Sequence, residues 1–161
     1  MTSRLLVDKL EGKTTSGTIQ MPAGHIIQVV ENTTSSTIST TSTSLGATGH
    51  IVSITPKFAN SKLIISLFGG EQSYSGSEII VGHINLYRQL TGGSYTDIGQ
   101  ICENTTSGNI YGMTHGSELV DTSHNTTSAI NYQPYIKTGS GKTYYYNYQL
   151  ACVLKVMEVA Q

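Results

Sequence analysis

The chain has 161 residues, a formal net charge of -1 and only 12% charged residues. No cluster of Lys or Arg supplies the positive potential that a nucleic-acid groove or an anionic membrane surface requires, so we expect neither as a partner. The sequence has no run of about 18 apolar residues and no apolar N-terminal leader, so it predicts no membrane insertion and a protein that is soluble where it is made.

The composition indicates an all-β protein of one domain. Thr and Tyr favour strands, whereas Gly, Ser and Asn favour turns, and the chain contains 17 Gly but only 3 Pro and no Trp. Its length suffices for one domain with a sizeable core and is short for two. We therefore expect an antiparallel β-sandwich, or jelly roll, over residues 25–161, preceded by an arm over residues 1–24.

The N-terminal arm differs in character from the rest of the chain. Short apolar stretches alternate with polar turns, and the segment closes at Pro22-Ala-Gly24. A segment this short cannot build a core of its own, so we expect it to be extended and to become ordered only against another chain or another copy. The apolar residues predicted to anchor it are Leu5, Val7, Leu10, Ile19 and Met21.

Apolar runs predict the strands of the sandwich, and polar stretches rich in Gly, Ser and Asn predict the loops between them, including one at residues 69–77. Pro56 is expected where a strand leaves its ladder, because proline has no N–H to donate. The predicted strands are residues 25–30, a weak edge strand within 33–44, two strands within 51–68, and then 79–88, 95–102, 117–121 and 126–132.

The C-terminal run, residues 143–159, predicts one long strand that crosses the whole sandwich. Side chains of period two form a continuous apolar and aromatic face, and the enrichment in β-branched and aromatic residues argues against a helix. The opposite face is too apolar for open solvent and too polar for an ordinary core, which suits a contact with a neighbouring subunit. The predicted residues of the core or of a trimer interface are Tyr144, Tyr145, Tyr146, Tyr148, Leu150 and Leu154.

Residues that could carry catalysis are few. Glu118 and Asp121 lie near His115 and His124 in the sequence, yet no nucleophile, metal or phosphate-binding motif accompanies them. We therefore expect no catalytic residues, no metal and no cofactor. The two cysteines, Cys102 and Cys152, lie in apolar strand-like segments and are predicted to be buried free thiols.

Tyrosine is the residue type that best suits a partly wet contact, because its ring is apolar and its hydroxyl is polar. The chain has 10 Tyr against 2 Phe. Tyrosines in loop-like segments either contact a ligand or pack the loop bases onto the sandwich, and the sequence leaves both open. The candidate receptor contacts are Tyr74, Tyr95, Tyr111, His115 and His124.

Three stretches of the chain carry a family resemblance. They are Val7-Asp-Lys-Leu-Glu-Gly-Lys-Thr-Thr-Ser-Gly-Thr-Ile-Gln-Met-Pro-Ala-Gly-His-Ile-Ile-Gln-Val-Val30, Ile54-Thr-Pro-Lys-Phe-Ala-Asn-Ser-Lys-Leu-Ile65 and Leu86-Tyr-Arg88. With them the chain resembles virion structural proteins of marine tailed bacteriophages, cyanophages especially, which are often tail-fibre-like. The first two stretches are fairly specific, and the resemblance extends from residue 5 to the final strand.

The resemblance implies a trimeric jelly roll similar to the tumour-necrosis-factor and C1q type, displayed on the virion surface after synthesis in the host cytoplasm. It places the C-terminal strand in the middle of a sheet near the threefold axis. Implied partners are further copies of the chain, other virion proteins (a tail fibre, the tail or the major capsid protein) and a host-surface glycan or protein. An arm of about 24 residues, with no long shaft, leaves two roles open: a receptor-binding tail-fibre knob, or a capsid decoration protein of the cement or head-fibre kind. A host-polysaccharide depolymerase is the distant third.

Overall fold

The computed structural model describes residues 22–73, 80–106, 111–139, 141–148 and 150–161. The five anchoring residues expected in the arm lie outside these ranges. The described residues form eleven strands and no helix. The strands are β1 (Ile26–Thr34), β2 (Ile38–Thr40), β3 (Gly46–Ala47), β4 (Val52–Ile54), β5 (Lys62–Ser73), β6 (Ile80–Leu90), β7 (Thr96–Thr106), β8 (Tyr111–Asp121), β9 (Ile130–Thr138), β10 (Tyr144–Asn147) and β11 (Cys152–Val159).

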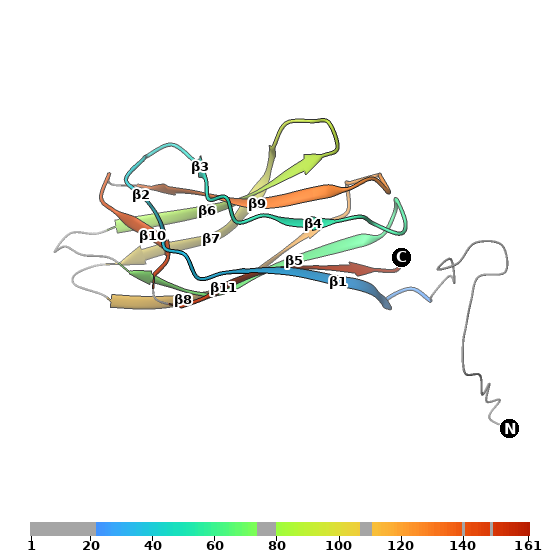
Figure 1. The fold of residues 1–161 in the computed structure, drawn as a ribbon, viewed down its shortest axis with the longest axis horizontal. Coiled ribbons are helices and arrows are strands. Elements are labelled where there is room, and N and C mark those ends of the chain that lie inside the picture. Colours follow the sequence, from blue (N-terminus) through green and yellow to red (C-terminus); the bar gives the residue numbers. More distant parts are fainter. Residues whose placement is uncertain (1–21, 74–79, 107–110, 140, 149) are drawn as a thin grey trace, which may run out of the picture.

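Two antiparallel sheets face each other (Figure 1). The first sheet has the order β1-β11-β5-β8, and the second has the order β3-β9-β6-β7, with β4 also paired to β9. The short strands β2 and β10 pair with each other at one end of the sandwich. If β3 and β4 count as one interrupted strand and the β2–β10 pair is set aside, the sheet orders read 1-8-3-6 and 2-7-4-5. This is the strand order of a jelly roll, so the predicted fold class is confirmed.

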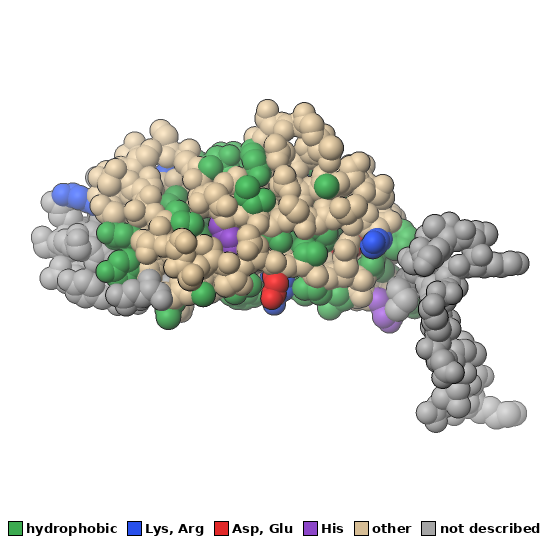
Figure 2. Space-filling model, viewed as in Figure 1, with side chains coloured by type: hydrophobic (Ala, Val, Ile, Leu, Met, Phe, Trp, Pro, Cys, Tyr) green, Lys and Arg blue, Asp and Glu red, His purple; other side chains and the backbone are tan. Residues whose placement is uncertain are grey.

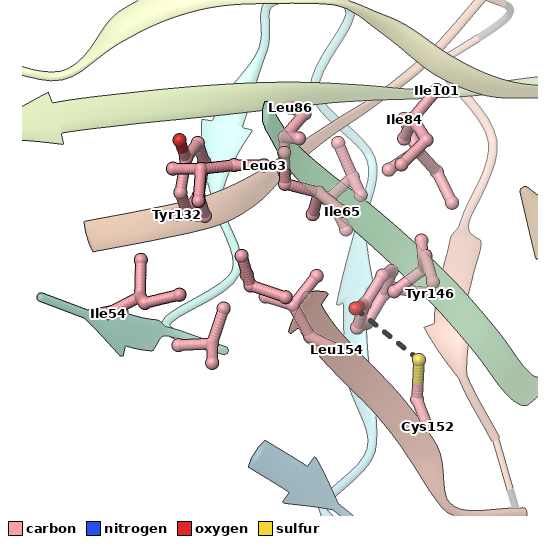
Figure 3. Close-up of a cluster of buried hydrophobic side chains, with 14 of the residues drawn as sticks. Ile54, Leu63, Ile65, Ile84, Leu86, Ile101, Tyr132, Tyr146, Cys152 and Leu154 are labelled. Atoms are coloured by element: carbon pink, nitrogen blue, oxygen red, sulfur yellow. Dashed lines mark hydrogen bonds between the residues drawn. The ribbon is translucent and has the colours of Figure 1, made fainter. Parts of the chain in front are cut away.

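The core lies between the sheets and is built by alternation. On β5 and β11 the residues at one parity are buried, and those at the other parity point outward. Figure 3 shows side chains from both sheets converging in this space. The core residues that are completely buried include Leu63, Ile65, Leu67, Ile84, Leu86, Ile130, Tyr132, Tyr146, Cys152, Leu154 and Val156.

The prediction of one long C-terminal strand is wrong. The run is divided into β10, which pairs with β2, and β11, which lies inside the first sheet. Between them the backbone turns: the N–H of Leu150 donates to the carbonyl of Tyr148 at 2.9 Å, and the carbonyl of Ala151 accepts from the N–H of Gly70 at 2.9 Å. Tyr146 and Cys152 are six residues apart, and both point inward. Because six is an even number, the inward and outward residues alternate in the sequence as they would in one uninterrupted strand, and the pattern does not reveal the turn.

Two predicted loops are strands. Residues 69–73 continue β5, with an irregularity in its pairing to β8 between Gly69 and Glu71. Gly69 and Gly70 have φ values of +79° and +65°, which is the conformation that glycine adopts without strain. The strand expected at residues 117–121 begins at Tyr111. Glycines that indicate a loop in the sequence here bend a strand instead.

Candidate assembly surface

The outer face of the first sheet carries an apolar row that crosses all four strands. The register places Val29 of β1 beside Met157 of β11, which pairs with Ile64 of β5 and, through it, with Val120 of β8. Val29 and Val120 are 49% and 50% exposed, and the two central residues are half-buried. Isolated apolar residues are normal on a surface, but a continuous row over a whole sheet marks a contact site.

A charged row lies next to the apolar one. Lys155 of β11 stands between Glu31 of β1 and Ser66 of β5, and the Ser66 hydroxyl donates to the carboxylate of Glu118 at 2.7 Å. The Lys155 ammonium also lies 5.8 Å from the centre of the Phe68 ring, in a cation–π contact. The row holds one cation between two carboxylates, so a partner that covers this face has to match both signs.

A second apolar row flanks the charged one on its other side. Val153 of β11 pairs with Phe68 of β5, which is 40% exposed. In Figure 2, apolar side chains are visible along the lower margin of the molecule, at the level of β1 and β11 in Figure 1. We call this face the assembly surface and define it by Val29, Met157, Ile64, Val120, Val153 and Phe68.

The residues predicted for the core or a trimer interface separate into three groups. Tyr144, Tyr146 and Leu154 are buried between the sheets. Tyr145 and Tyr148 are half-buried, with ring centres 5.1 Å apart. Leu150 is 49% exposed, because it lies in the turn before β11 and not in a strand. None of the six belongs to the assembly surface.

The candidate receptor contacts whose side chains the structure describes, His115, His124 and Tyr95, are not brought together. His115 and His124 are buried, so the surface position that their polar surroundings in the sequence suggested is wrong for both. The His124 ring nitrogens lie 2.9 Å from the Ser61 carbonyl and 3.1 Å from the Thr126 carbonyl. Tyr95 is half-buried just before β7. Tyr74 lies outside the described residues, as does the side chain of Tyr111.

His115 belongs to a buried polar network within the core. One ring nitrogen of His50 donates to the Asn32 carbonyl at 2.9 Å, so the other accepts from the Tyr146 hydroxyl, also at 2.9 Å. The Cys152 thiol lies 3.4 Å from both that hydroxyl and His115 Nε2. Burial lowers the pKa of His50, although its bond to the backbone carbonyl opposes the shift. Burial, reinforced by repulsion from His50, lowers the pKa of His115 to about 4, and burial raises the pKa of the Cys152 thiol to about 11. The network is therefore neutral near pH 7.

Asp121 connects the two sheets. Its carboxylate accepts from Arg88 of β6 at 2.8 and 2.9 Å, from the Tyr132 hydroxyl of β9 at 2.7 Å and from the N–H of Ser123 at 2.8 Å. Burial alone would raise the pKa of Asp121, but these donors hold it below its ordinary value. The same carboxylate raises the pKa of Tyr132, adding to the effect of burial. With every acceptor direction occupied, Asp121 is a structural tie and not a free acid or base.

Glu158 sits in a cradle made by the stretch Ile54–Ile65. Its fully buried carboxylate accepts from the backbone N–H groups of Lys57 and Phe58, at 2.8 and 3.1 Å, and from the Ser61 hydroxyl at 2.7 Å. The Gln28 amide donates to it at 2.6 Å. Burial would raise the pKa of Glu158, but the donors lower it. This stretch, which carries much of the family resemblance, therefore fastens the β4–β5 connection to the C-terminal strand.

Sequence reasoning found only part of the assembly surface. It assigned the outer face of the C-terminal run to a subunit contact, but it did not find the apolar residues of β1, β5 and β8 that extend this face. The available signal was the run Leu63–Phe68, in which five of six residues are apolar at both parities of a strand. Such a run is typical of strands buried on both faces. Among the described residues, no group of three or more His, Cys, Asp or Glu side chains is placed to hold a metal ion. Nor does this part of the chain contain a helix long and apolar enough to cross a membrane.

No protein-family model and no curated protein sequence matches the chain. Among solved structures, it is similar to VP2 of infectious bursal disease virus in a subviral particle, with 15% identity and a TM-score of 0.51. That match covers 99% of this chain but spans only 37% of the VP2 chain. A structure of the Gx strain of the same virus matches with 14% identity and a TM-score of 0.45, covering 100% of this chain and 42% of that one.

A third solved structure is the CBM22-1 xylan-binding domain of Paenibacillus barcinonensis Xyn10C. It matches with 12% identity and a TM-score of 0.39, covering 86% of this chain and 97% of that one. At such low identity, the likeness to the VP2 subviral particle concerns the β-sandwich fold alone. The scores of the other two matches are too low to support an argument.

Proposed function

We propose that the protein is a non-enzymatic structural component of a bacteriophage virion, a trimeric knob that assembles through the outer face of its first sheet. The observation that carries this proposal is the assembly surface, where apolar residues of four strands remain exposed or half-buried in the single chain. Burying apolar area contributes roughly 25 cal/mol per Å², so a face of this kind is stabilised by a partner. The resemblance to phage virion proteins and the jelly-roll strand order support a second and third copy as that partner.

Light scattering of the full chain tests the assembly. At micromolar concentration we expect three times the mass of one chain, because a closed ring uses every copy of the same surface. A monomer would contradict the proposal. A dimer would retain the surface as an interface but refute the threefold symmetry and the likeness to tumour-necrosis-factor and C1q trimers.

We assign attachment to the virion to the arm over residues 1–24. The composition of the arm supports this, since spaced apolar residues between polar turns suit the addition of a strand to a partner's sheet edge. A deletion should stop at Met21, because the N–H of Gly24 already donates to the Ala160 carbonyl at 2.9 Å. Residues 22–161 should keep the trimer mass and a nearly unchanged melting temperature but fail to enter particles. Truncated protein that still binds particles would assign attachment to the sandwich.

Two positions on the virion agree with this proposal. The first is the knob of a tail fibre that binds a host-surface receptor, in contact with the tail or the fibre. The alternative is a decoration protein on the major capsid protein. Electron microscopy of intact particles carrying a labelled copy of the chain distinguishes them, because the label appears on the tail in one case and on the head in the other.

A polysaccharide depolymerase is the remaining alternative. The roles of His115 and Asp121 inside the core oppose it, since neither side chain is free to reach a substrate. Incubation of host capsular or cell-wall polysaccharide with the purified protein should release no reducing ends. Release that is lost on Asp121→Asn, in a variant that remains folded, would overturn the assignment.

A further inference from the structure

Three tyrosines form a cluster on the outer face of the second sheet. The rings of Tyr87 on β6 and Tyr135 on β9 are stacked, with centres 3.9 Å apart and an angle of 20° between their planes. Tyr95, just before β7, lies with its ring centre 6.0 Å from that of Tyr135, tilted by 52°. All three are half-buried. We call Tyr87, Tyr95 and Tyr135 the tyrosine cluster.

The register shows that the cluster covers the sheet from outside. Tyr87 pairs with Gln133, and Tyr135 pairs with Asn85, so the two stacked tyrosines are diagonal neighbours on adjacent strands. Gln133 is only 4% exposed although alternation places it on the outer face. The stacked rings on neighbouring strands therefore give this outer face an aromatic surface that is partly open to solvent.

Polar side chains with fixed orientations border the cluster. Asn85 donates to one oxygen of Asp97 at 2.8 Å, and the other oxygen accepts from the N–H of Gly99 at 2.9 Å. At the other end, Asn131 donates to the Gln89 amide oxygen at 2.9 Å, and Gln89 donates onward to the Gly93 carbonyl at 3.0 Å. Amides and carboxylates that are already oriented lose little entropy when a ligand binds.

A pocket of about 240 Å³ adjoins this border. Gln89, which lines it, is two residues from Tyr87 on the same face of β6, and Asn131 faces it from β9. The Thr91 hydroxyl donates to the Ala129 carbonyl across the pocket, at 2.7 Å. The lining holds amides, a hydroxyl and apolar groups but no charged side chain: Gln89, Leu90, Thr91, Gly92, Ala129 and Asn131.

We propose that the tyrosine cluster and this pocket bind a neutral sugar ring of a glycan. A pyranose ring has apolar C–H faces that stack on aromatic rings, and hydroxyls that both donate to and accept from amides. The pocket is smaller than the roughly 300 to 1,000 Å³ of drug-sized sites, which suits one ring with the rest of the chain outside. The pocket lining is uncharged, and Asp97 pairs with Tyr87 of the cluster in the β6–β7 register, so neutral sugars are favoured over acidic ones.

This inference rests on the proposed function in one respect: the second sheet stays accessible because assembly uses the first. In the purified full chain, we expect calorimetric titration to detect millimolar binding of neutral oligosaccharides built from glucose, galactose or N-acetylglucosamine. A polyuronate should bind at least tenfold more weakly. Equal or stronger binding of the polyuronate would overturn the assignment to neutral sugars.

Two single substitutions test the position of the site. Tyr95→Ala and Asn131→Ala should each weaken binding at least tenfold, because one removes an aromatic face and the other an amide at the pocket. Tyr148→Ala is the matched control, since this half-buried tyrosine lies before the turn into β11, away from the cluster. Unchanged melting temperatures and masses show that the variants remain folded. Binding that survives both substitutions would overturn the site.

The outcomes also separate this inference from the proposed function. A chain that forms trimers but binds none of the neutral oligosaccharides refutes the glycan site and leaves the assembly intact. A monomer that binds them, with loss on Tyr95→Ala, refutes the assembly and leaves the glycan site.

Discussion

The two outer faces of the sandwich differ although both sheets are antiparallel. On the first sheet, outward residues such as Val29 and Val120 have apolar side chains, which neither donate nor accept hydrogen bonds. On the second, outward residues such as Asn85 and Asn131 donate hydrogen bonds to neighbouring side chains. The backbone does not determine this difference; it follows from the residues at every second position of each strand. The jelly roll alone therefore assigns neither face a role.

The difference predicts opposite responses to contact. Covering the assembly surface removes apolar area from water and is favourable without exact matching, apart from the charged row at Lys155. Covering the second sheet displaces water from amides and carboxylates, which is favourable only if the partner replaces those hydrogen bonds. A ligand rich in hydroxyl groups meets this condition, and a flat apolar protein surface does not.

The strongest test of the assignment of faces is on β11 and the turn before it. Leu154→Asp should prevent folding, with a loss of more than about 4 kcal/mol, because it buries an unpaired carboxylate between the sheets. Leu150→Asp should change the unfolding free energy by about 0.5 kcal/mol or less, because Leu150 is exposed. Denaturant unfolding of the two variants beside the parent measures both. A folded Leu154→Asp variant would mean that the inner and outer sides of β11 are exchanged.

The tie between the sheets gives the next largest effect. Asp121→Ala removes the acceptor of Arg88 and of the buried Tyr132 hydroxyl, and should cost about 3 to 5 kcal/mol in unfolding free energy. Asp97→Ala removes an exposed carboxylate from the second face and should cost about 1 kcal/mol or less. Thermal unfolding of both variants provides the comparison. Equal losses of unfolding free energy in the two variants would show that Asp121 does not hold the two sheets together.

Acid should weaken the core. The pKa of His115 is about 4 in the folded chain and near 6.5 when unfolded, so the unfolded state binds the proton more readily. The stability that this group contributes is present above pH 6.5 and is lost as the pH falls toward 4, on the order of 3 kcal/mol. Asp121 and Glu158, whose pKa values are lowered, extend the loss below that range.

Urea unfolding between pH 8 and 4 measures this dependence. His115→Gln should make the curve shallower between about pH 6.5 and 4. A parent curve that is flat through this interval would show that the network around Tyr146 tolerates protonation.

The smallest effect on the single chain concerns the assembly surface. Val120→Glu should shift the unfolding free energy of a monomer by about 0.5 kcal/mol or less, since the side chain is 50% exposed, yet it should lower the mass from trimer to monomer. Thr105→Glu, at an exposed position on β7 of the second sheet, is the matched control and should leave the trimer mass unchanged. Light scattering of both variants measures their masses and so tests whether the first sheet is the interface. A Val120→Glu trimer would exclude the first sheet as the interface.

Much of the fold was predictable from the sequence, because most strands appear in it as apolar runs bounded by turn residues. The division of the C-terminal run was not, since Tyr146 and Cys152 remain in phase across the turn. The extension of β5 was hidden by Gly69 and Gly70, whose local preference for turns is overridden by pairing with β8. Local preferences fail where long-range pairing determines the conformation.

The sites were less predictable than the fold. His115 and His124 occur among polar residues in the sequence, but tertiary packing buries both. The tyrosine cluster joins residues from three separate segments, and only Tyr95 could be singled out by its loop-like surroundings. The order of strands in the two sheets brings Tyr87 and Tyr135 together, and no local pattern encodes that order.

The pairing of β1 with β11 has a mechanical consequence. The two strands are antiparallel and pair in continuous register from Gln28 opposite Glu158 to Thr34 opposite Cys152, after a bulge between Ile26 and Gln28, and β1 is the first strand after the arm. A force that pulls the arm along the axis of β1 loads these hydrogen bonds in shear, so that they share the load and must break together. A force directed across the sheet would peel them apart one at a time. Single-molecule stretching in the two directions should therefore give a higher rupture force along β1 than across the sheet. If the arm attaches the domain to the virion, the resistance of that attachment to force would depend on the direction of the pull and not on the number of contacts.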